Sequence, residues 1–251
     1  IDKQMKIKNL VMILALAAVT VGCADKPKQE TKKEVKETNY SELTKQYAKV
    51  KLTSDISHLS DNEKQMLNYL YEVGNIMDDI FWTQQFGGDK ETFLNSIQDP
   101  DARLFAEINY GPWNHFENLA PFLPEYGEIP AGAGFYPADM TKEEFEAWDD
   151  PDKTSLYTLI RRDENGKLQS VWYHEAYAEQ IQKAADLLLK AADLAGDKEF
   201  ADYLRLRSKA LLTDEYFESD MAWMDVRNNN VDFVVGPIEN YVDALYGYKA
   251  A

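Results

Sequence analysis

The sequence predicts an α+β fold, mainly helical with short strands and one hairpin. Three observations lead to this prediction. Residues 66–81 carry apolar side chains at helical spacing, in a stripe broad enough to pack on two sides. Residues 175–195 repeat an apolar helical face. Asn165-Gly166 separates two β-type runs in the way that is typical of a hairpin turn.

The first predicted elements lie between residues 47 and 110. Alternating apolar and polar residues at 47–53 predict a short strand. Ser60 and Asp61 cap the long helix, and Gly87-Gly88 ends it. Two shorter helices are predicted near 90–97 and 101–110.

Residues 111–138 are rich in proline and glycine and show no periodicity. They are predicted to form an ordered loop, because large aromatic side chains are unfavourable when left in water. The aromatic residues concerned are Trp113, Phe116, Phe122, Phe135 and Tyr136.

The remaining elements are again mainly helical. Residues 141–144 have the pattern of a capping box at a helix start. Runs at 156–162 and 168–173 form the two arms of the hairpin. The helix at 175–195 is predicted to stop at Gly196. Helices at 198–212 and about 215–226 follow, and a final apolar strand leads into Gly236-Pro237.

Residues 1–23 are predicted to be an export signal of the lipoprotein type. A basic region at 5–8 precedes an apolar run at 10–21, which is too short to span a bilayer stably. Cys23 follows a glycine, as in the bacterial lipoprotein box, in which the cysteine is acylated and becomes the mature N-terminus. The alternative is a plain secretory signal with an incidental cysteine.

Cys23 is the single cysteine of the 251 residues, so the chain contains no internal disulfide. Residues 24–40 are rich in Lys and Glu with almost no apolar residue, and are predicted to be a flexible charged tether. The protein is therefore expected to be exported and lipid-anchored to a bacterial membrane, on its periplasmic or surface face.

The net charge of −17 argues against nucleic acid as a partner. Phosphate binding requires clustered Lys and Arg, which an acidic chain of this kind does not offer. The charge fits solubility and weakly favours basic substrates through the overall field.

Two stretches resemble a known family. Residues 132–141 read Gly-Ala-Gly-Phe-Tyr-Pro-Ala-Asp-Met-Thr, and residues 234–241 read Val-Val-Gly-Pro-Ile-Glu-Asn-Tyr. Both resemble the dipeptidyl peptidase III family of zinc metallopeptidases in its bacterial lipoprotein form. The resemblance implies that residues 41–251 are the amino-terminal, first lobe of a two-lobed fold, truncated at the C-terminal end. Some plant members are fused to a nudix domain, whose Glu-rich box is absent from this sequence.

The zinc motif of that family, His-Glu-x-x-Gly-His followed later by Glu-Glu-x-x-Ala-Asp, does not occur in the sequence. The three histidines, His58, His115 and His174, lie far apart, whereas a zinc site normally needs three protein ligands. No serine-nucleophile elbow and no phosphate-binding glycine loop is present. The sequence thus predicts no catalytic residue and no metal ligand in this chain, and the zinc cofactor expected of the full-length protein would be held outside it.

The resemblance also implies that Asp232 and Glu239 bind substrate. In the family, an acidic side chain of the matching strand helps to hold the free amino terminus of a peptide, with a tyrosine nearby. Aligned on Gly236 and Glu239, the acid falls on Asp232 and the tyrosine on Val234, which has no hydroxyl. A buried ammonium group needs carboxylate partners, so the role is physically sound. The alternative is that both carboxylates are only solvated. The edge of this strand can also pair with an extended peptide.

The predicted function is the substrate-side portion of a zinc-dependent dipeptidyl peptidase, which removes dipeptides from peptide amino termini. The portion alone is expected to be inactive because the zinc motif is absent. Its predicted partners are a peptide substrate and, through the lipid, a membrane. The alternative is a non-enzymatic surface lipoprotein that binds peptides or a partner protein.

Overall fold

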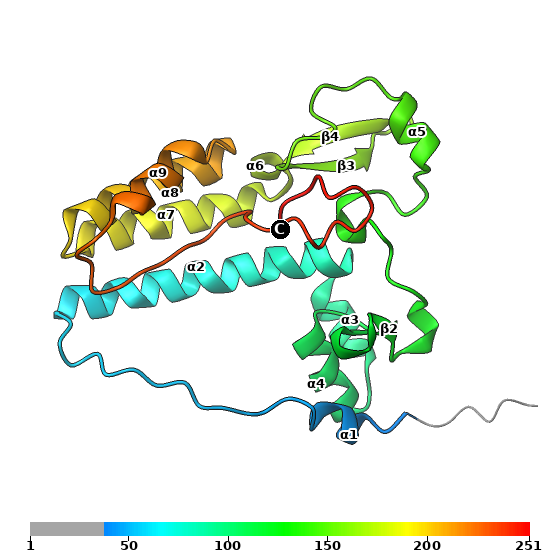
Figure 1. Ribbon diagram of the computed structural model, residues 1–251, viewed down its shortest axis with the longest axis horizontal. Helices are drawn as coiled ribbons and strands as arrows, with labels where there is room; N and C mark the ends of the chain where they lie inside the picture. Colours follow the sequence, from blue (N-terminus) through cyan, green and yellow to red (C-terminus); the bar gives the residue numbers. More distant parts are fainter. Residues whose placement is uncertain (1–37) are drawn as a thin grey trace, which may run out of the picture. The chain divides into compact units, whose positions relative to one another are not determined.

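The long helix α2 (Asp61–Phe86) is the central element of the computed structural model, which describes residues Thr38–Ala251 (Figure 1). The helix begins with the predicted cap. Ser60 Oγ accepts a hydrogen bond from Glu63 N at 3.2 Å, and the Glu63 carboxylate accepts one from Ser60 N at 2.8 Å. The helix ends at Gly87, whose φ of 78° lies in the left-handed region. The predicted start and stop are confirmed.

Three helices from the second half of the chain form a layer with α2. α7 (Ala178–Leu194) packs against α2 and against α8 (Lys198–Thr213), and α8 packs against α9 (Phe217–Asp225). Figure 1 shows α7 running along α2, with α8 and α9 beyond it. The core that they share includes Ile181, Leu188, Phe200, Tyr203 and Leu204. The predicted pairing of these two helices across a short loop is confirmed for α7 and α8.

A second apolar core lies around the C-terminal end of α2. α3 (Lys90–Ser96) and α4 (Pro100–Asn109) follow α2, and the short strand β1 (Trp113–Asn114) pairs antiparallel with β2 (Ala120–Pro121). α1 (Tyr40–Thr44) packs on the same core. The buried side chains are Trp82, Phe93, Leu94, Phe105, Ala106, Phe122 and Leu123.

The predicted ordered loop at 111–138 contains β1, β2 and three 3-10 turns, η1 (His115–Glu117), η2 (Pro124–Tyr126) and η3 (Ala133–Phe135). Four of the five aromatic side chains expected to be buried there are buried. Phe116 is the exception, because it lies in η1 with 63% of its surface exposed. The prediction for Phe116 is wrong, and its ring lies beside Tyr47 at 5.0 Å.

The predicted hairpin is present. β3 (Thr158–Arg162) pairs antiparallel with β4 (Leu168–Trp172), with Ile160 opposite Ser170. The turn between the strands contains Gly166 at a φ of 75°, which glycine adopts without steric cost. Together with the helices, the hairpin confirms the predicted α+β class.

α5 (Lys142–Ala147) begins at the predicted cap, but the capping box is only half formed. Thr141 Oγ1 accepts a hydrogen bond from Glu144 N at 3.1 Å. The Glu144 carboxylate does not return to the cap, because it binds the guanidinium of Arg162 on β3 at 2.8 and 2.9 Å. A tertiary ion pair thus replaces the local hydrogen bond that the sequence predicts.

Two predicted strands are not formed by the described residues. Residues 47–53 belong to no sheet, and their Val50 and Leu52 side chains are exposed. The apolar run at 231–235 is likewise without a strand partner. Both segments have the sequence pattern of a strand. A strand also needs a neighbour to share backbone hydrogen bonds, and the described part of the chain places none beside either segment.

The helix predicted at 175–195 is interrupted. A one-turn helix α6 (Tyr173–Ala176) is separated from α7 at Tyr177, which has a φ of −117°. Gly196 is not the residue that stops the helix, because α7 already ends at Leu194 and its C-cap, Ala195, is extended. A Cβ at Gly196 would lie 3.3 Å from Glu63 Oε1, so the glycine leaves room for the capping carboxylate of α2.

The predicted signal at 1–23, with Cys23, and residues 24–37 of the predicted tether lie outside the described residues. α1 begins at Tyr40, the last residue of the predicted tether, and is capped by the Asn39 side chain. Within Thr38–Ala251, no helix combines the length and the apolar character that crossing a membrane requires.

Candidate functional site

The segment that the sequence singles out, residues 228–251, folds back on itself beside α2 and α8. Residues 226–235 run without helix or strand, and the chain turns at Gly236, which has a φ of 131°. The two ends of the following loop are then held together. Ile238 N donates to Ala251 O at 2.9 Å, and Ala251 N donates to Glu239 O at 2.7 Å. Figure 1 shows this loop in red between the helices and the hairpin.

The turn at Gly236 rests on a buried arginine of α8. The Arg207 guanidinium lies between the rings of Tyr203 and Tyr216, at 5.6 and 5.4 Å from their centroids. It forms an ion pair with Asp220 on α9. A Cβ at Gly236 would lie 3.1 Å from Arg207 Nη1, so a side chain at this position would press on the guanidinium.

The loop at 240–250 is organised around one buried carboxylate, that of Asp243. Asp243 Oδ2 accepts a hydrogen bond from the Tyr136 hydroxyl at 2.7 Å. Burial, and then this hydrogen bond, raises the pKa of Tyr136. The carboxylate also accepts the backbone N–H groups of Leu245, Tyr246, Tyr248 and Lys249, at 2.9 to 3.1 Å.

Lys249 attaches the loop to the hairpin region. Its ammonium group is buried and donates to Lys153 O, Ser155 O and Thr158 Oγ1 at 2.8 to 2.9 Å. Tyr173 adds a second attachment, because its hydroxyl donates to Ala250 O at 2.8 Å. The backbone that carries Glu239 is therefore held by a fixed set of polar contacts.

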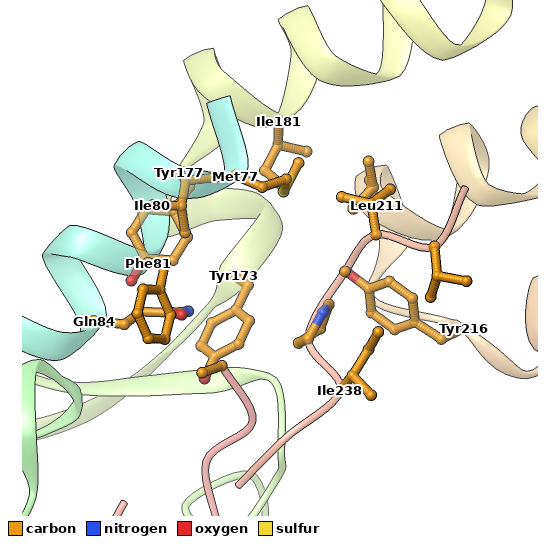
Figure 2. A pocket seen from close by; sticks show the side chains of 15 residues that line it. Met77, Ile80, Phe81, Gln84, Tyr173, Tyr177, Ile181, Leu211, Tyr216 and Ile238 are labelled. Atoms are coloured by element: carbon orange, nitrogen blue, oxygen red, sulfur yellow. The ribbon is translucent and has the colours of Figure 1, made fainter. Parts of the chain in front are cut away.

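An apolar cavity of about 270 Å³ lies between α2, the α6–α7 junction and residues 234–238. Figure 2 shows Tyr173 and Tyr177 on one side and Leu211, Tyr216 and Ile238 on the other. Burial raises the pKa of Tyr177 to about 12, so this phenol stays protonated at neutral pH. The cavity has the size and lining to accept one apolar side chain.

Asp232 lies outside that cavity. Its Oδ1 accepts hydrogen bonds from Trp223 Nε1 and from Phe233 N, both at 2.9 Å. The residue is exposed, and it borders a different hollow with Trp223 and Arg227. Val234, on which the family's tyrosine would fall, lines the apolar cavity and offers no hydroxyl there.

Glu239 is exposed, and its side chain forms no hydrogen bond or ion pair with another described residue. It directly follows Ile238, the residue at the rim of the cavity. The structure therefore does not place Asp232 and Glu239 in one pocket of the described chain. Glu239 stands beside the cavity, and Asp232 stands beyond the turn at Gly236.

The described residues do not fit a zinc ion. His174 Nδ1 lies 2.7 Å from Oδ2 of buried Asp214, and burial raises the pKa of that carboxyl. His115 Nε2 lies 3.1 Å from Asn109 O, and His58 is exposed in a turn. Across Thr38–Ala251, no group of three or more His, Cys, Asp or Glu side chains is arranged to hold a metal.

Sequence reasoning missed the residues that hold the segment in place, namely Arg207, Asp243, Lys249 and Tyr173. Asp243 carried a local signal, because an acid that begins a short turn commonly accepts backbone N–H groups. Arg207 and Lys249 carried none, since their partners lie 13 and 91 to 96 residues away in the chain. Only the fold brings those groups together.

These features define a mainly helical α+β lobe that presents an apolar cavity and a rigidly held loop. Its likeness to solved structures is extensive. DPP III from Caldithrix abyssi is 38% identical, with a TM-score of 0.78 over 84% of this chain and 42% of that one. Dipeptidyl-peptidase III from Corallococcus sp. strain EGB is 30% identical, with the same TM-score and the same coverage of both chains.

A curated plant protein, Nudix hydrolase 3 of Arabidopsis thaliana, is 28% identical over 86% of this chain and 36% of its own length. No protein-family model matches the chain. The chain belongs to the dipeptidyl peptidase III family and is a peptidase-related domain. It spans less than half the length of each of these relatives.

Proposed function

We propose that this chain is the substrate-side portion of a zinc-dependent dipeptidyl peptidase and forms one wall of its peptide groove. The observation that carries this proposal is the placement of Glu239. Its carboxylate is exposed and free of partners among the described residues, while its backbone is held on both sides by Ala251. A fixed carboxylate next to an apolar cavity suits the ammonium group and first side chains of a peptide.

Backbone groups along residues 231–235 support the same proposal. None of them bonds to another backbone group of the described chain, although Val231 O accepts from the Asn229 side chain and Phe233 N donates to the Asp232 side chain. A peptide in extended conformation can therefore pair with this segment by β-addition. Backbone hydrogen bonds of this kind provide affinity that does not depend on the side chains of the peptide. Asp232, whose Oδ2 accepts no hydrogen bond from the described chain, would add a second carboxylate beyond the turn.

The zinc and its ligands, in this proposal, belong to residues outside these 251. The described residues contribute binding and orientation, and no bond-breaking step is assigned to them. Export and lipid attachment through Cys23 are part of the proposal as well. Membrane fractionation of the chain and of its Cys23→Ala variant tests them, and an unchanged membrane fraction for the variant would exclude the lipid anchor.

The binding role is tested with two peptides of identical sequence, one with a free amino terminus and one acetylated. We expect calorimetry to give the free peptide a Kd about tenfold lower, which is a difference of about 1.4 kcal/mol. Glu239→Gln removes the charge that the ammonium needs, so it should abolish this difference. Asp232→Asn should reduce the difference in part.

Glu164→Gln is the matched control, because Glu164 is an exposed glutamate in the hairpin turn. It should leave both affinities unchanged. Equal affinity of the unaltered chain for the two peptides would contradict a role in amino-terminal recognition. That role would also be excluded if Glu239→Gln bound both peptides as the unaltered chain does.

A further inference from the structure

Residues 48–53 form an exposed segment without the contacts that normally hold such a chain, and we call this segment the strap. Every residue from 48 to 58 is exposed, and the side chains of Val50 and Leu52 have 69% and 90% of their surface in water. No backbone N–H or C=O of residues 48–55 bonds to another backbone group of the described chain. The backbone of the strap is therefore open to a partner.

The strap is fixed at both ends. The Tyr47 hydroxyl donates to Asn109 Oδ1 at 3.1 Å, and the Tyr47 ring packs beside Phe105 at 6.0 Å. At the other end Leu59 is buried and Ser60 caps α2. Figure 1 shows the strap drawn out between α1 and the start of α2. An extended form is thus imposed by the two anchors.

The sequence of the strap matches a half-buried strand. Lys49, Lys51 and Thr53 alternate with Val50 and Leu52, and side chains of an extended chain alternate between two faces. A single exposed apolar side chain means little. Val50 and Leu52 are two large apolar side chains on the same face of a segment whose backbone groups are free. This combination is typical of an edge strand that pairs with another strand.

The partner that fits is another β-strand with an apolar face. A second copy of this chain is disfavoured, because two copies that each carry a net charge of −17 repel one another. The solved relatives offer a different source, since the matched region is only 42% of their length. More than half of such a protein is therefore available to cover surfaces that these residues leave open.

We propose that residues 48–53 are an edge strand that pairs with a β-strand from the region of a dipeptidyl peptidase III-type chain lying outside the matched part. Backbone hydrogen bonds provide the pairing, and Val50 and Leu52 enter the apolar layer that this pairing creates. The strap then ties the start of α2 to the remaining region of the protein. This inference is independent of the peptide site, because it uses none of its residues.

The test compares the chain alone with a chimera in which it replaces the matching part of the Caldithrix abyssi protein. Hydrogen exchange is followed at the amides of residues 49–53. We expect these amides to exchange without protection in the chain alone. In the chimera every second amide, either 49, 51 and 53 or 50 and 52, should slow by at least about 100-fold, since an edge strand pairs on one side only and paired amides are protected. Equally fast exchange in both proteins would overturn the proposal.

Two double variants separate the faces of the strap. Val50→Gln with Leu52→Gln should leave the Tm of the chain alone unchanged and lower that of the chimera by about 5 °C or more. Lys49→Gln with Lys51→Gln, on the other face, should have little effect in either protein. Equal effects of the two pairs in the chimera would contradict the proposed alternation.

Two further outcomes are decisive. If the chimera does not fold, the same exchange measurement and the same paired substitutions are made at the aligned positions of the Caldithrix abyssi protein itself. Protection there supports the proposal, and its absence rejects it. If sedimentation shows that the chain alone is a dimer with protected strap amides, the occupant is a second copy and the proposed partner is wrong.

Discussion

Lys249 shows how much a single residue contributes to the loop that carries Glu239. Its side chain is fully buried, yet its ammonium group meets no carboxylate and is held by three neutral oxygens. The ring of Tyr136 lies 5.9 Å from the charge. Burial lowers the pKa of Lys249 to about 8. The loop is thus held by the Lys249 ammonium group, which loses its proton at a pH only slightly above neutral.

This lowered pKa predicts a pH dependence of stability. In an unfolded chain the pKa of lysine is about 10.4, so between about pH 8 and 10.4 the unfolded state binds more protons than the folded state. The free energy of unfolding should therefore rise with pH in that window, by at most about 1.4 kcal/mol per pH unit. Below about pH 8 this group contributes no slope, because it is charged in both states.

Urea unfolding at pH values between about 7.5 and 9.5 measures the slope before tyrosines of the unfolded chain ionise. Lys249→Met should remove it. Lys167→Met, at an exposed position of the hairpin turn, should keep it. A flat or falling profile for the unaltered chain would show that Lys249 does not change its pKa on folding.

At the scale of elements, the contact between α2 and η3 depends on the absence of a side chain. A Cβ at Gly134 would collide with Thr83 O and would lie 2.9 Å from both Gln84 O and Gly87 Cα. These are backbone atoms, so they cannot move aside as a flexible side chain can. Arg161 reinforces the contact by donating to Gly134 O and Phe135 O at 3.0 and 3.2 Å.

Two identical substitutions should therefore have opposite effects. Gly134→Ala forces the 3-10 turn away from α2 and should destabilise the protein by about 1–3 kcal/mol or more. Gly74→Ala lies in the middle of α2, where a Cβ would meet no atom within 4 Å, and should stabilise the helix by about 0.5–1 kcal/mol. Denaturant unfolding of both variants measures this contrast. An unchanged stability of Gly134→Ala would refute the close approach.

Helices and strands differ in how well the sequence predicted them. The helices α2, α3, α4, α8 and α9 begin and end close to the predicted positions, because caps and periodicity act over a few residues. The strands predicted at 47–53 and near 231–235 are not formed, because a strand needs a partner that local alternation cannot supply. The hairpin is present because only five residues separate its two strands.

At the scale of the whole molecule, a peptidase-related fold is combined with potential metal ligands that do not cluster in the described part. Its three histidines are distributed over a turn, the 3-10 turn η1 and the one-turn helix α6. No cluster of potential ligands forms within Thr38–Ala251. The proposed function therefore predicts that the chain binds peptides and leaves their cleavage to residues outside it.

The purified chain is expected to release no dipeptide from a dipeptidyl arylamide, with or without added zinc, because zinc normally requires about three protein ligands. Calorimetry should show no stoichiometric zinc binding at sub-micromolar Kd. DPP III from Caldithrix abyssi, assayed in parallel, serves as the reference. Cleavage by the chain alone, or tight binding of one zinc per chain, would contradict the proposal that the zinc and its ligands lie outside this chain.

The sequence by itself determined the α+β class, most of the helix boundaries, the hairpin turn and the likeness to dipeptidyl peptidase III. These features rest on periodicity, caps and short motifs, which depend on neighbours in the chain. The tertiary structure decided where Asp232 and Glu239 lie, and it separated them around Gly236. It alone showed that Arg207 and Lys249 hold that segment and that Tyr136 donates to Asp243, since these partners are distant in sequence and meet only when the apolar core is formed.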